Sequence, residues 1–282
     1  MSKVVILGAK RTALGALLGQ FTGVPATQLG ATAIQAAVAQ SGVKPEAVDE
    51  VIMGCVLPAG LKQGPARQAA LGAGIPAAAG ATTINKVCGS GMKATMLAHD
   101  LIKAGTNDIM VAGGMESMTN APYVLPKARG GYRMGHGQVM DHMFLDGLED
   151  ARTGRLMGSF AQDMANTMGL TRADMDAFAV ESLRRANAAI ANGDFKAEIV
   201  PVPVQTRKGE VLVDTDEQPG NANIDKIPQL KAAFAKDGTI TAANASSNSD
   251  GAAALVMTRE SVAKARMPLG RMVTLAVLAA NS

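Results

Sequence analysis

The chain has 282 residues, of which 48% are apolar and 18% charged, and its formal net charge is +3. This length is enough for one large domain or two ordinary ones. The charges are spread along the sequence, and no basic cluster could neutralise a run of phosphates, which argues against a nucleic-acid partner.

Neither a leader nor a membrane-spanning segment is predicted. The N-terminus lacks the run of about 7 to 15 apolar residues of a secretory leader, and no stretch approaches the roughly 20 apolar residues that cross a bilayer. The two cysteines, Cys55 and Cys88, are too few for a disulfide framework and lack metal-site spacing. We therefore expect a cytoplasmic protein with no metal and no bound cofactor.

Apolar runs rich in β-branched residues alternate with helical patterns over the first 115 residues. This alternation is typical of parallel strands joined by crossover helices. Gly42 is expected to cap the end of the first helix. The predicted strands are 4–7, 51–56, 82–84 and 108–112, and the predicted helices are 27–41, 66–71 and 89–104.

The pattern changes between residues 115 and 240 to Gly-rich loops, two polar helices and a Pro/Asp/Gly-rich stretch, which suggests an insertion over the sheet. One of these helices, 172–192, is predicted to begin after an N-cap at Thr171 and to bury a face that includes Met175 and Phe178. A buried strand is predicted at 252–257 and a charged helix at 259–266. A last strand at 271–276 would be left as an open edge, so the sequence looks cut there.

The segment NKVCGSGMKA, residues 85–94, carries the strongest chemical signal. It places Cys88 where a buried strand gives way to a helix, and the N–H groups and dipole of a helix N-terminus stabilise a thiolate. Gly89 and Gly91 would allow a tight turn and a close approach by a ligand. Cys88 is thus a candidate nucleophile on an elbow, although a free cysteine can also be a small buried residue. Cys55 is interpreted as the latter.

The same segment resembles the acyl-enzyme signature of the thiolase family. Further stretches match that family in order: VVILGAKRTALG, QGPARQAA, VAGGMESMTNAPY, DEQPG and TAANASSNSDGAAALVM. The resemblance implies an α/β fold of three α-β-α layers with a mixed, mostly parallel sheet. It implies a discontinuous N-terminal domain, residues 1–120 plus 241–265, a loop domain at 121–240 covering the coenzyme A site, and the start of a truncated C-terminal domain at 266–282.

The resemblance also implies a reaction. An acyl group passes from an acyl-CoA to Cys88, and the enolate of acetyl-CoA then takes it, or a 3-ketoacyl-CoA is cleaved in reverse. Acyl-CoA and acetyl-CoA are the expected small-molecule partners, and a homodimer or homotetramer is expected. The loop carrying His136 and His142 is interpreted as surface and tetramer contact, because the two lack the spacing and third ligand of a metal site.

Four more residues match positions of the family's coenzyme A site. Ser246 resembles a serine that hydrogen-bonds the pantetheine, while Phe234, Leu148 and Met157 match residues lining the site. From the sequence alone, these three apolar residues could equally be core residues, and Ser246 could equally be a helix cap or turn residue.

The sequence departs from the family by lacking three C-terminal motifs, which would supply the activating histidine and a second cysteine. Leu156 also stands where several short-chain thiolases have histidine. We therefore expect this chain alone to be inactive. Three readings compete: an acyltransferase completed by a C-terminal half, a non-catalytic module that binds coenzyme A or serves assembly, and a related condensing enzyme of the ketoacyl synthase type.

Overall fold

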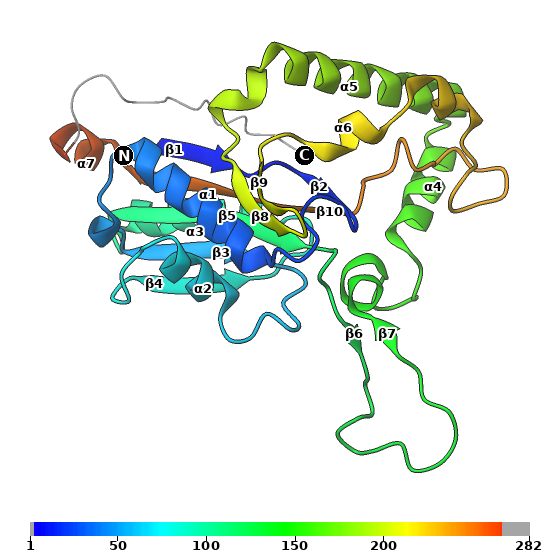
Figure 1. The fold of residues 1–282 in the computed structure, drawn as a ribbon, viewed down its shortest axis with the longest axis horizontal. Coiled ribbons are helices and arrows are strands. Elements are labelled where there is room, and N and C mark those ends of the chain that lie inside the picture. The colour runs from blue at the N-terminus through cyan, green and yellow to red at the C-terminus, as the bar shows by residue number, and fades with distance from the viewer. Residues whose placement is uncertain (1–2, 267–282) are drawn as a thin grey trace.

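A computed structural model describes residues 3–266, and its centre is a mixed β-sheet (Figure 1). Strand β10 is antiparallel to both of its neighbours, β1 and β5, whereas β5, β3 and β4 pair in parallel. All the long strands except β10 therefore run in one direction, as predicted. The order across the sheet is β1 (Val4–Arg11), β10 (Ser249–Arg259), β5 (Ile109–Ser117), β3 (Glu50–Gly54) and β4 (Gly80–Ile84), and the short β2 (Gly15–Ala16) also pairs with β10.

Helices cover both faces of this sheet. Because side chains alternate along a strand, Val51 and Met53 of β3 pack with α1 (Ala26–Ser41) and α2 (Pro65–Gly72), whereas Ile52 packs with α3 (Ser90–Ala104). The alternation of strand and helix from β1 to β5 thus produces three α-β-α layers. Gly42 ends α1 in the left-handed conformation with φ of 72°, as predicted.

The chain between β5 and β10 leaves the sheet and returns to it. It contains two hairpins, of which the sequence predicted neither, so the expectation of loops and helices alone was wrong. In order, its elements are β6 (Tyr123–Val124), β7 (Met140–Asp141), the π-helical turn η2 (Phe144–Leu148), α4 (Met157–Thr167), α5 (Arg172–Asn192), η3 (Asp194–Ala197), β8 (Val202–Thr206), β9 (Gly209–Val213), α6 (Glu217–Asn221) and η4 (Ile224–Gln229); η1 (Pro45–Ala47) precedes β3, and α7 (Glu260–Arg266) follows β10.

Helix α5 begins at its predicted cap and buries part, but not all, of its predicted face. The Thr171 hydroxyl accepts a hydrogen bond from the Asp174 N–H at 3.2 Å, whereas Phe178 is 78% exposed. Met175 is half-buried and Ala179, on the same predicted face, is buried. Beside them Asp176 is also buried, and its carboxylate accepts from Arg172 Nε at 2.7 Å. Arg172 also donates to the Ile227 carbonyl of η4 at 3.1 Å, so polar contacts add to the apolar ones that hold this helix.

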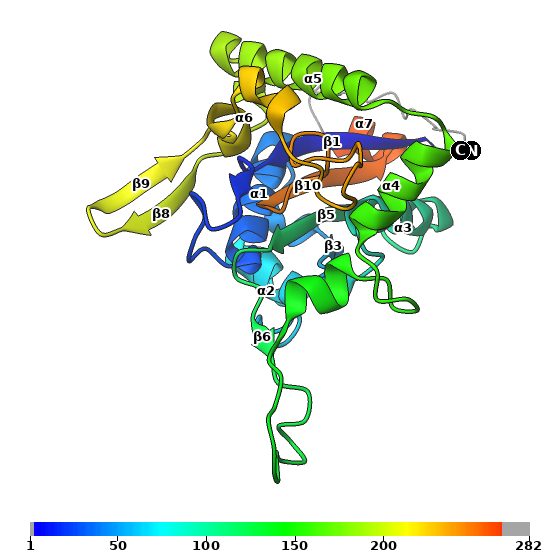
Figure 2. The ribbon, with the colours of Figure 1, turned by 90° about the vertical axis from the view of Figure 1, so that its right-hand side faces the viewer.

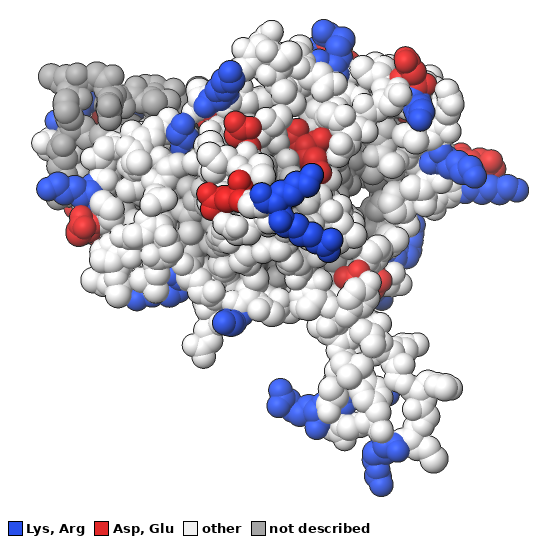
Figure 3. Space-filling model, viewed as in Figure 1, with Lys and Arg blue, Asp and Glu red and all other residues white. Residues whose placement is uncertain are grey.

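The hairpin β6–β7 projects from the body as an arm, and the hairpin β8–β9 projects on another side (Figure 2). Lys127, Arg129 and Arg133 lie on the arm between its two short strands. In Figure 3 the end of the arm accordingly shows Lys and Arg with no acidic side chain on the visible face.

None of the helices within residues 3–266 has the length and apolarity to cross a membrane. The strand predicted at 271–276 lies outside the described residues.

Candidate active site

Cys88 lies on an exposed turn between strand β4 and helix α3, directly before the helix cap Gly89. Side chains within the segment fix the turn. The Asn85 Oδ1 accepts from the Val87 N–H at 2.8 Å, and the Ser90 hydroxyl accepts from the Lys86 N–H at 2.8 Å while donating to the Val87 carbonyl at 2.6 Å. The sulfur is therefore held at the N-terminus of α3, as the sequence predicted.

The tight point of the turn is Val87, not one of the glycines. Val87 has φ of 48°, in the left-handed region that β-branched residues rarely adopt, whereas Gly89 has φ of −88°. Such a conformation costs on the order of 1–3 kcal/mol and persists only where the surroundings enforce it. The expectation that Gly89 supplies the turn was wrong, because its conformation is open to any residue.

Glycines instead let the start of α3 lie close to the sheet. A Cβ on Gly54, at the end of β3, would lie 2.6 Å from the Ser90 backbone carbon and 2.7 Å from the Gly91 nitrogen. Gly91 in turn faces Gly114 of β5, where its Cβ would lie 3.6 Å from the Gly114 nitrogen. The missing side chains thus set the position of the elbow over the ends of β3 and β5.

Cys88 lines a cavity of about 410 Å³ at this edge of the sheet. Its walls come from widely separated parts of the chain: β1, the end of β3, the elbow, β5, the η2 turn and β10. Most lining groups are apolar or glycine, and the ionisable ones are Arg11, Cys88 and Glu116. The lining residues are Arg11, Leu14, Gly54, Val56, Leu57, Val87, Cys88, Ser90, Gly91, Gly114, Met115, Glu116, Met118, Gly147, Leu148, Ser247, Ser249, Gly251, Ala252 and Ala253.

Glu116 is a cavity residue that sequence reasoning did not single out. Its carboxylate accepts from the backbone N–H groups of Val56 at 2.8 Å and Leu57 at 3.1 Å. Burial raises the pKa of this carboxyl, and the two N–H groups oppose that rise. The motif GGMESM contained the residue, but nothing local in the sequence indicates partners about sixty positions away.

Cys55 and Cys88 have opposite environments. Cys55 is 1% exposed, follows the last residue of β3, and lies with its sulfur 3.7 Å from a Glu116 oxygen. Burial, followed by the negative charge of Glu116, raises the pKa of the Cys55 thiol to about 12. Of the two thiols, Cys88 is therefore the one available for nucleophilic chemistry.

His142 is buried, which corrects the surface-loop prediction for this residue, whereas His136 is exposed as expected. The ring Nδ1 of His142 lies 2.6 Å from Asp146 Oδ2, and the Nε2 accepts from the Ala59 N–H at 3.4 Å. Among the described residues, no three metal-ligating side chains gather at one place.

Arg11, another lining residue, joins strand β1 to the residue after η3 and the residue before α6. Its Nη1 and Nη2 donate to the two Asp216 oxygens at 2.8 and 3.0 Å, and its Nε donates to Glu198 at 2.6 Å. The same Asp216 carboxylate accepts from the Leu14 N–H at 2.8 Å. A bidentate arginine–carboxylate pair of this kind fixes orientation as well as distance.

The structure brings one of the four predicted coenzyme A residues to the cavity with Cys88, namely Leu148. Ser246 is exposed and outside the lining, where its neighbour Ser247 lies instead. Phe234 and Met157 are also outside the lining, and the Phe234 ring lies against Gly158, where a Cβ would be 2.1 Å from it. Met157 is the first residue of α4 and is exposed.

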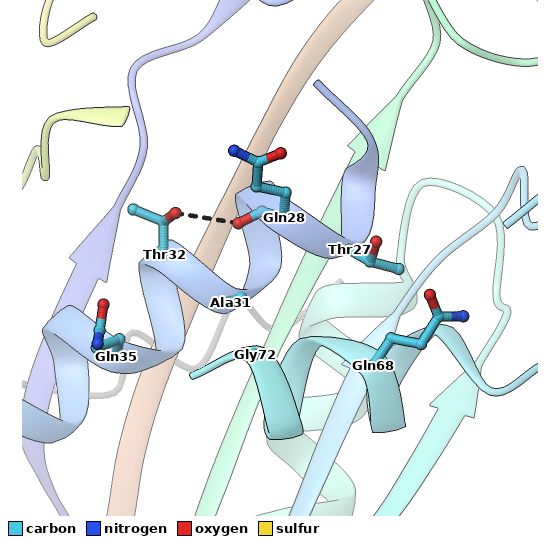
Figure 4. Close-up of a pocket in the computed structure, with 7 residues that line it drawn as sticks. All are labelled: Thr27, Gln28, Ala31, Thr32, Gln35, Gln68 and Gly72. Atoms are coloured by element: carbon cyan, nitrogen blue, oxygen red, sulfur yellow. Dashed lines mark hydrogen bonds between the residues drawn. The ribbon is translucent and has the colours of Figure 1, made fainter. Parts of the chain in front are cut away.

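A second hollow, of about 360 Å³, lies between α1 and α2 (Figure 4). Its lining consists of amides, hydroxyls and small side chains from Thr27 to Gly72, with no charged group and no nucleophile. The Gln68 amide already donates to the carbonyls of Leu61 and Gln63. This hollow offers no group for acyl transfer.

The fold and the elbow define an α/β protein that presents an exposed cysteine at a helix N-terminus, beside a largely apolar cavity. A family model described as thiolase, N-terminal domain, matches residues 4–261. The chain belongs to the thiolase family.

Named relatives and a solved structure agree with this assignment. Acetyl-CoA acetyltransferases of Pseudomonas aeruginosa and Cupriavidus necator are 50% and 52% identical to the chain, and each comparison covers 94% of this chain and 68% of the relative. The structure of acetyl-CoA acetyltransferase from Syntrophomonas wolfei superposes with a TM-score of 0.90 at 38% identity, over 94% of this chain and 67% of that one. The chain thus spans about two thirds of the length of these relatives.

Proposed function

We propose that the protein is an acyl-CoA C-acyltransferase that works through an acyl-Cys88 thioester. The observation that supports this proposal most strongly is the exposed Cys88 at a helix N-terminus, on the wall of a largely apolar cavity. Acetyl-CoA acetyltransferase is the printed name of relatives at about half identity, which supports acyl-CoA and acetyl-CoA as the substrates.

In the first step the Cys88 thiolate attacks the thioester carbonyl of an acyl-CoA. The tetrahedral intermediate collapses, the carbon–sulfur bond to coenzyme A breaks, and coenzyme A leaves as a thiolate. One thioester replaces another, so the step needs neither an oxidant nor a reductant. The N–H groups of the first turn of α3 lie beside this centre and would stabilise developing negative charge.

In the second step the carbanion formed at the methyl carbon of acetyl-CoA attacks the acyl-Cys88 carbonyl. A carbon–carbon bond forms, the bond to the Cys88 sulfur breaks, and 3-ketoacyl-CoA leaves. Thiolysis is the reverse of these steps. Removal of the methyl proton requires a base, and such proton transfers are worth about a hundredfold to ten-thousandfold in rate.

We further propose that residues 3–266 support acylation but not turnover. The cavity lining given above includes no histidine, and Glu116 is its one carboxylate. That carboxylate already accepts two backbone hydrogen bonds, so it is poorly placed to take a proton from a substrate carbon.

We propose two contact zones for coenzyme A. Leu148 would contact the acyl end of the ligand at the cavity, whereas Met157, the first residue of α4, and Phe234, beside Gly158, would contact the coenzyme further out. Ser246 would reach the pantetheine from the segment that enters β10. We also propose that the protein is a homo-oligomer in which the arm β6–β7 contacts a second copy.

Acetylation of the intact protein tests the proposed function. Incubated with acetyl-CoA, the protein should gain one acetyl group, which peptide mapping by mass spectrometry should place on Cys88. The Cys88→Ala variant should gain none, and Cys55→Ala should behave as the unmodified chain does. Absence of an adduct, or an adduct on Cys55, would contradict the proposal.

A further inference from the structure

The segment from Cys55 to Ala59 forms one wall of the cavity without belonging to a strand or helix. It follows β3, and its residues Val56 and Leu57 line the cavity. A wall of irregular backbone keeps its place only if its N–H groups find partners. Here the Cys55 N–H still donates to the Ile84 carbonyl of β4 at 3.0 Å, but the N–H groups of Val56, Leu57 and Ala59 donate to side chains from distant parts of the chain.

Glu116 holds the start of this segment. One carboxylate oxygen accepts from the Val56 N–H at 2.8 Å, the other accepts from the Leu57 N–H at 3.1 Å, and the Cys55 thiol lies 3.7 Å from the latter oxygen. Both oxygens are used as acceptors. In glutamine an NH2 group, which only donates, would replace one of these two oxygens, so one of the two N–H groups would face a donor.

His142 holds the other end. Its Nε2 accepts from the Ala59 N–H, so the ring proton is on Nδ1 and is donated to Asp146 at 2.6 Å. The next residue after Asp146, Gly147, lies against the same wall, because a Cβ there would be 3.3 Å from Leu57. Leu148 then lines the cavity. The wall is thus fastened at both ends and faced by the η2 turn.

A buried carboxylate is a costly way to satisfy two N–H groups, since burial disfavours its charge. Its position suggests a role beyond stability. Glu116 is itself in the lining of the cavity that holds Cys88, and the backbone that it fastens is the surface an acyl chain would meet.

We propose that Glu116 and His142 are positioning residues that hold segment 55–59 as the wall of the acyl pocket and thereby limit the length of the acyl chain transferred to Cys88. This rests on the proposed function, because it takes acylation of Cys88 as the reaction being selected. Neither residue touches the reacting atoms in this account.

The test compares Glu116→Gln and His142→Gln with the unmodified chain, and Glu210→Gln, on the exposed β8–β9 hairpin, serves as a carboxylate control. Acylation of Cys88 is timed by mass spectrometry with acetyl-, butyryl- and hexanoyl-CoA. In Glu116→Gln the rate with hexanoyl-CoA relative to acetyl-CoA should rise by about tenfold, the discrimination that a methylene or two carries in an apolar pocket. The control should keep the original ratio.

Hydrogen exchange gives a readout that is independent of acylation. The peptide containing Val56 and Leu57 should exchange faster in Glu116→Gln, and the peptide containing Ala59 should do so in His142→Gln. An unchanged chain-length ratio with unchanged exchange in Glu116→Gln would overturn the proposal. If Glu116→Gln does not fold, the His142→Gln variant is used instead. A higher rate with hexanoyl-CoA relative to acetyl-CoA in this variant would support the role of segment 55–59, and an unchanged ratio would overturn the proposal. Failure of the unmodified chain to acylate at all would instead contradict the proposed function.

Discussion

At the scale of single residues, the two cysteines of this chain provide a direct contrast. Cys88 is exposed at the elbow, whereas Cys55 is buried and the pKa of its thiol is raised to about 12. Because the thiolate is the reactive form, iodoacetamide at pH 8 should alkylate Cys88 at least about a hundredfold faster than Cys55. Timed labelling of native protein followed by peptide mapping measures both rates. Comparable rates would show that the environment of Cys55 is not as described.

Gly54 offers a second test, because it sets how close α3 lies to the sheet. In Gly54→Ala the new methyl group would collide with the backbone of Ser90, which cannot move without the elbow. We expect a loss of about 1–3 kcal/mol in the free energy of unfolding, as for other overpacked sites, and slower acetylation of Cys88.

Denaturant unfolding and mass spectrometry measure these two effects. Gly220→Ala is the matched control, since a Cβ at Gly220 meets nothing within 4 Å. Equal behaviour of the two variants would rule out close packing at Gly54 as the determinant of the elbow.

The buried carboxyl of Glu116 predicts a pH dependence of stability. Burial raises its pKa in the folded state, so the folded state binds this proton more tightly than the unfolded chain does. The stability from that proton is present at low pH and is lost as pH rises through the raised pKa. The groups facing Glu116 are the Cys55 thiol and His142, which is paired with Asp146.

Glu116→Gln has no such proton to lose. Its melting temperature relative to the unmodified chain should therefore increase as the pH rises from about 4 to 7. Thermal unfolding followed by circular dichroism at several pH values gives this difference. A difference that stays constant, or that falls with rising pH, would contradict the raised pKa.

Sequence reasoning reached Cys88 because its signal is local: strand, turn, cysteine and helix follow one another within ten residues. It did not predict the contacts of Glu116 and His142 with segment 55–59, because these partners lie about sixty and eighty positions away and are brought close only by the pairing of strands. It also assigned the turn to glycine, whereas the folded chain forces Val87 into the strained conformation.

At the scale of elements, the bidentate pair Arg11–Asp216 links strand β1 to the segment before α6. Asp216→Asn would remove the bidentate partner of Arg11, leaving Glu198 as the one carboxylate paired with its guanidinium, and would weaken the bond from the Leu14 N–H. Because both side chains are largely buried, we expect a loss of about 1–3 kcal/mol in the free energy of unfolding.

Urea unfolding measures this loss. Glu181→Gln removes a carboxylate that pairs with Arg184 and Arg185 on the outer surface of α5, and this control should change the unfolding midpoint much less. A cost in Asp216→Asn no greater than in the control would show that the link is not part of the folded framework.

Helices and strands with a clear periodicity of apolar residues were predicted well, whereas elements that depend on tertiary contacts were not. The four crossover strands and the helices between them follow from apolar runs and their spacing. The hairpins β6–β7 and β8–β9 have short or exposed strands without a clear alternation, so no pattern predicted them. Helix α5 has its predicted bounds and buries Ala179 of its predicted face, but Phe178 is exposed and an Arg172–Asp176 pair lies on the buried side.

At the scale of the whole molecule, the cavity depends on the return of the chain to the sheet. Strand β10 inserts between β1 and β5 after more than a hundred intervening residues, and its Gly251 to Ala253 meet Met115 and Cys88 in one lining. Sequence alone predicted a strand there but not its neighbours. The family resemblance predicted the three α-β-α layers. The cavity wall formed by residues 55–59, and the positions of Phe234 and Met157 outside the Cys88 cavity, could be seen only in the folded structure.

The most direct test of the central claim is whether acetyl-Cys88 is a competent intermediate. Protein labelled with radioactive acetyl-CoA and freed of excess reagent should, on addition of coenzyme A, return the label as acetyl-CoA and regain free Cys88. We expect complete transfer of the label, because the reverse thioester exchange needs only a bound thiol and the elbow. Label that stays on the protein in the presence of coenzyme A would contradict an acyl-Cys88 intermediate.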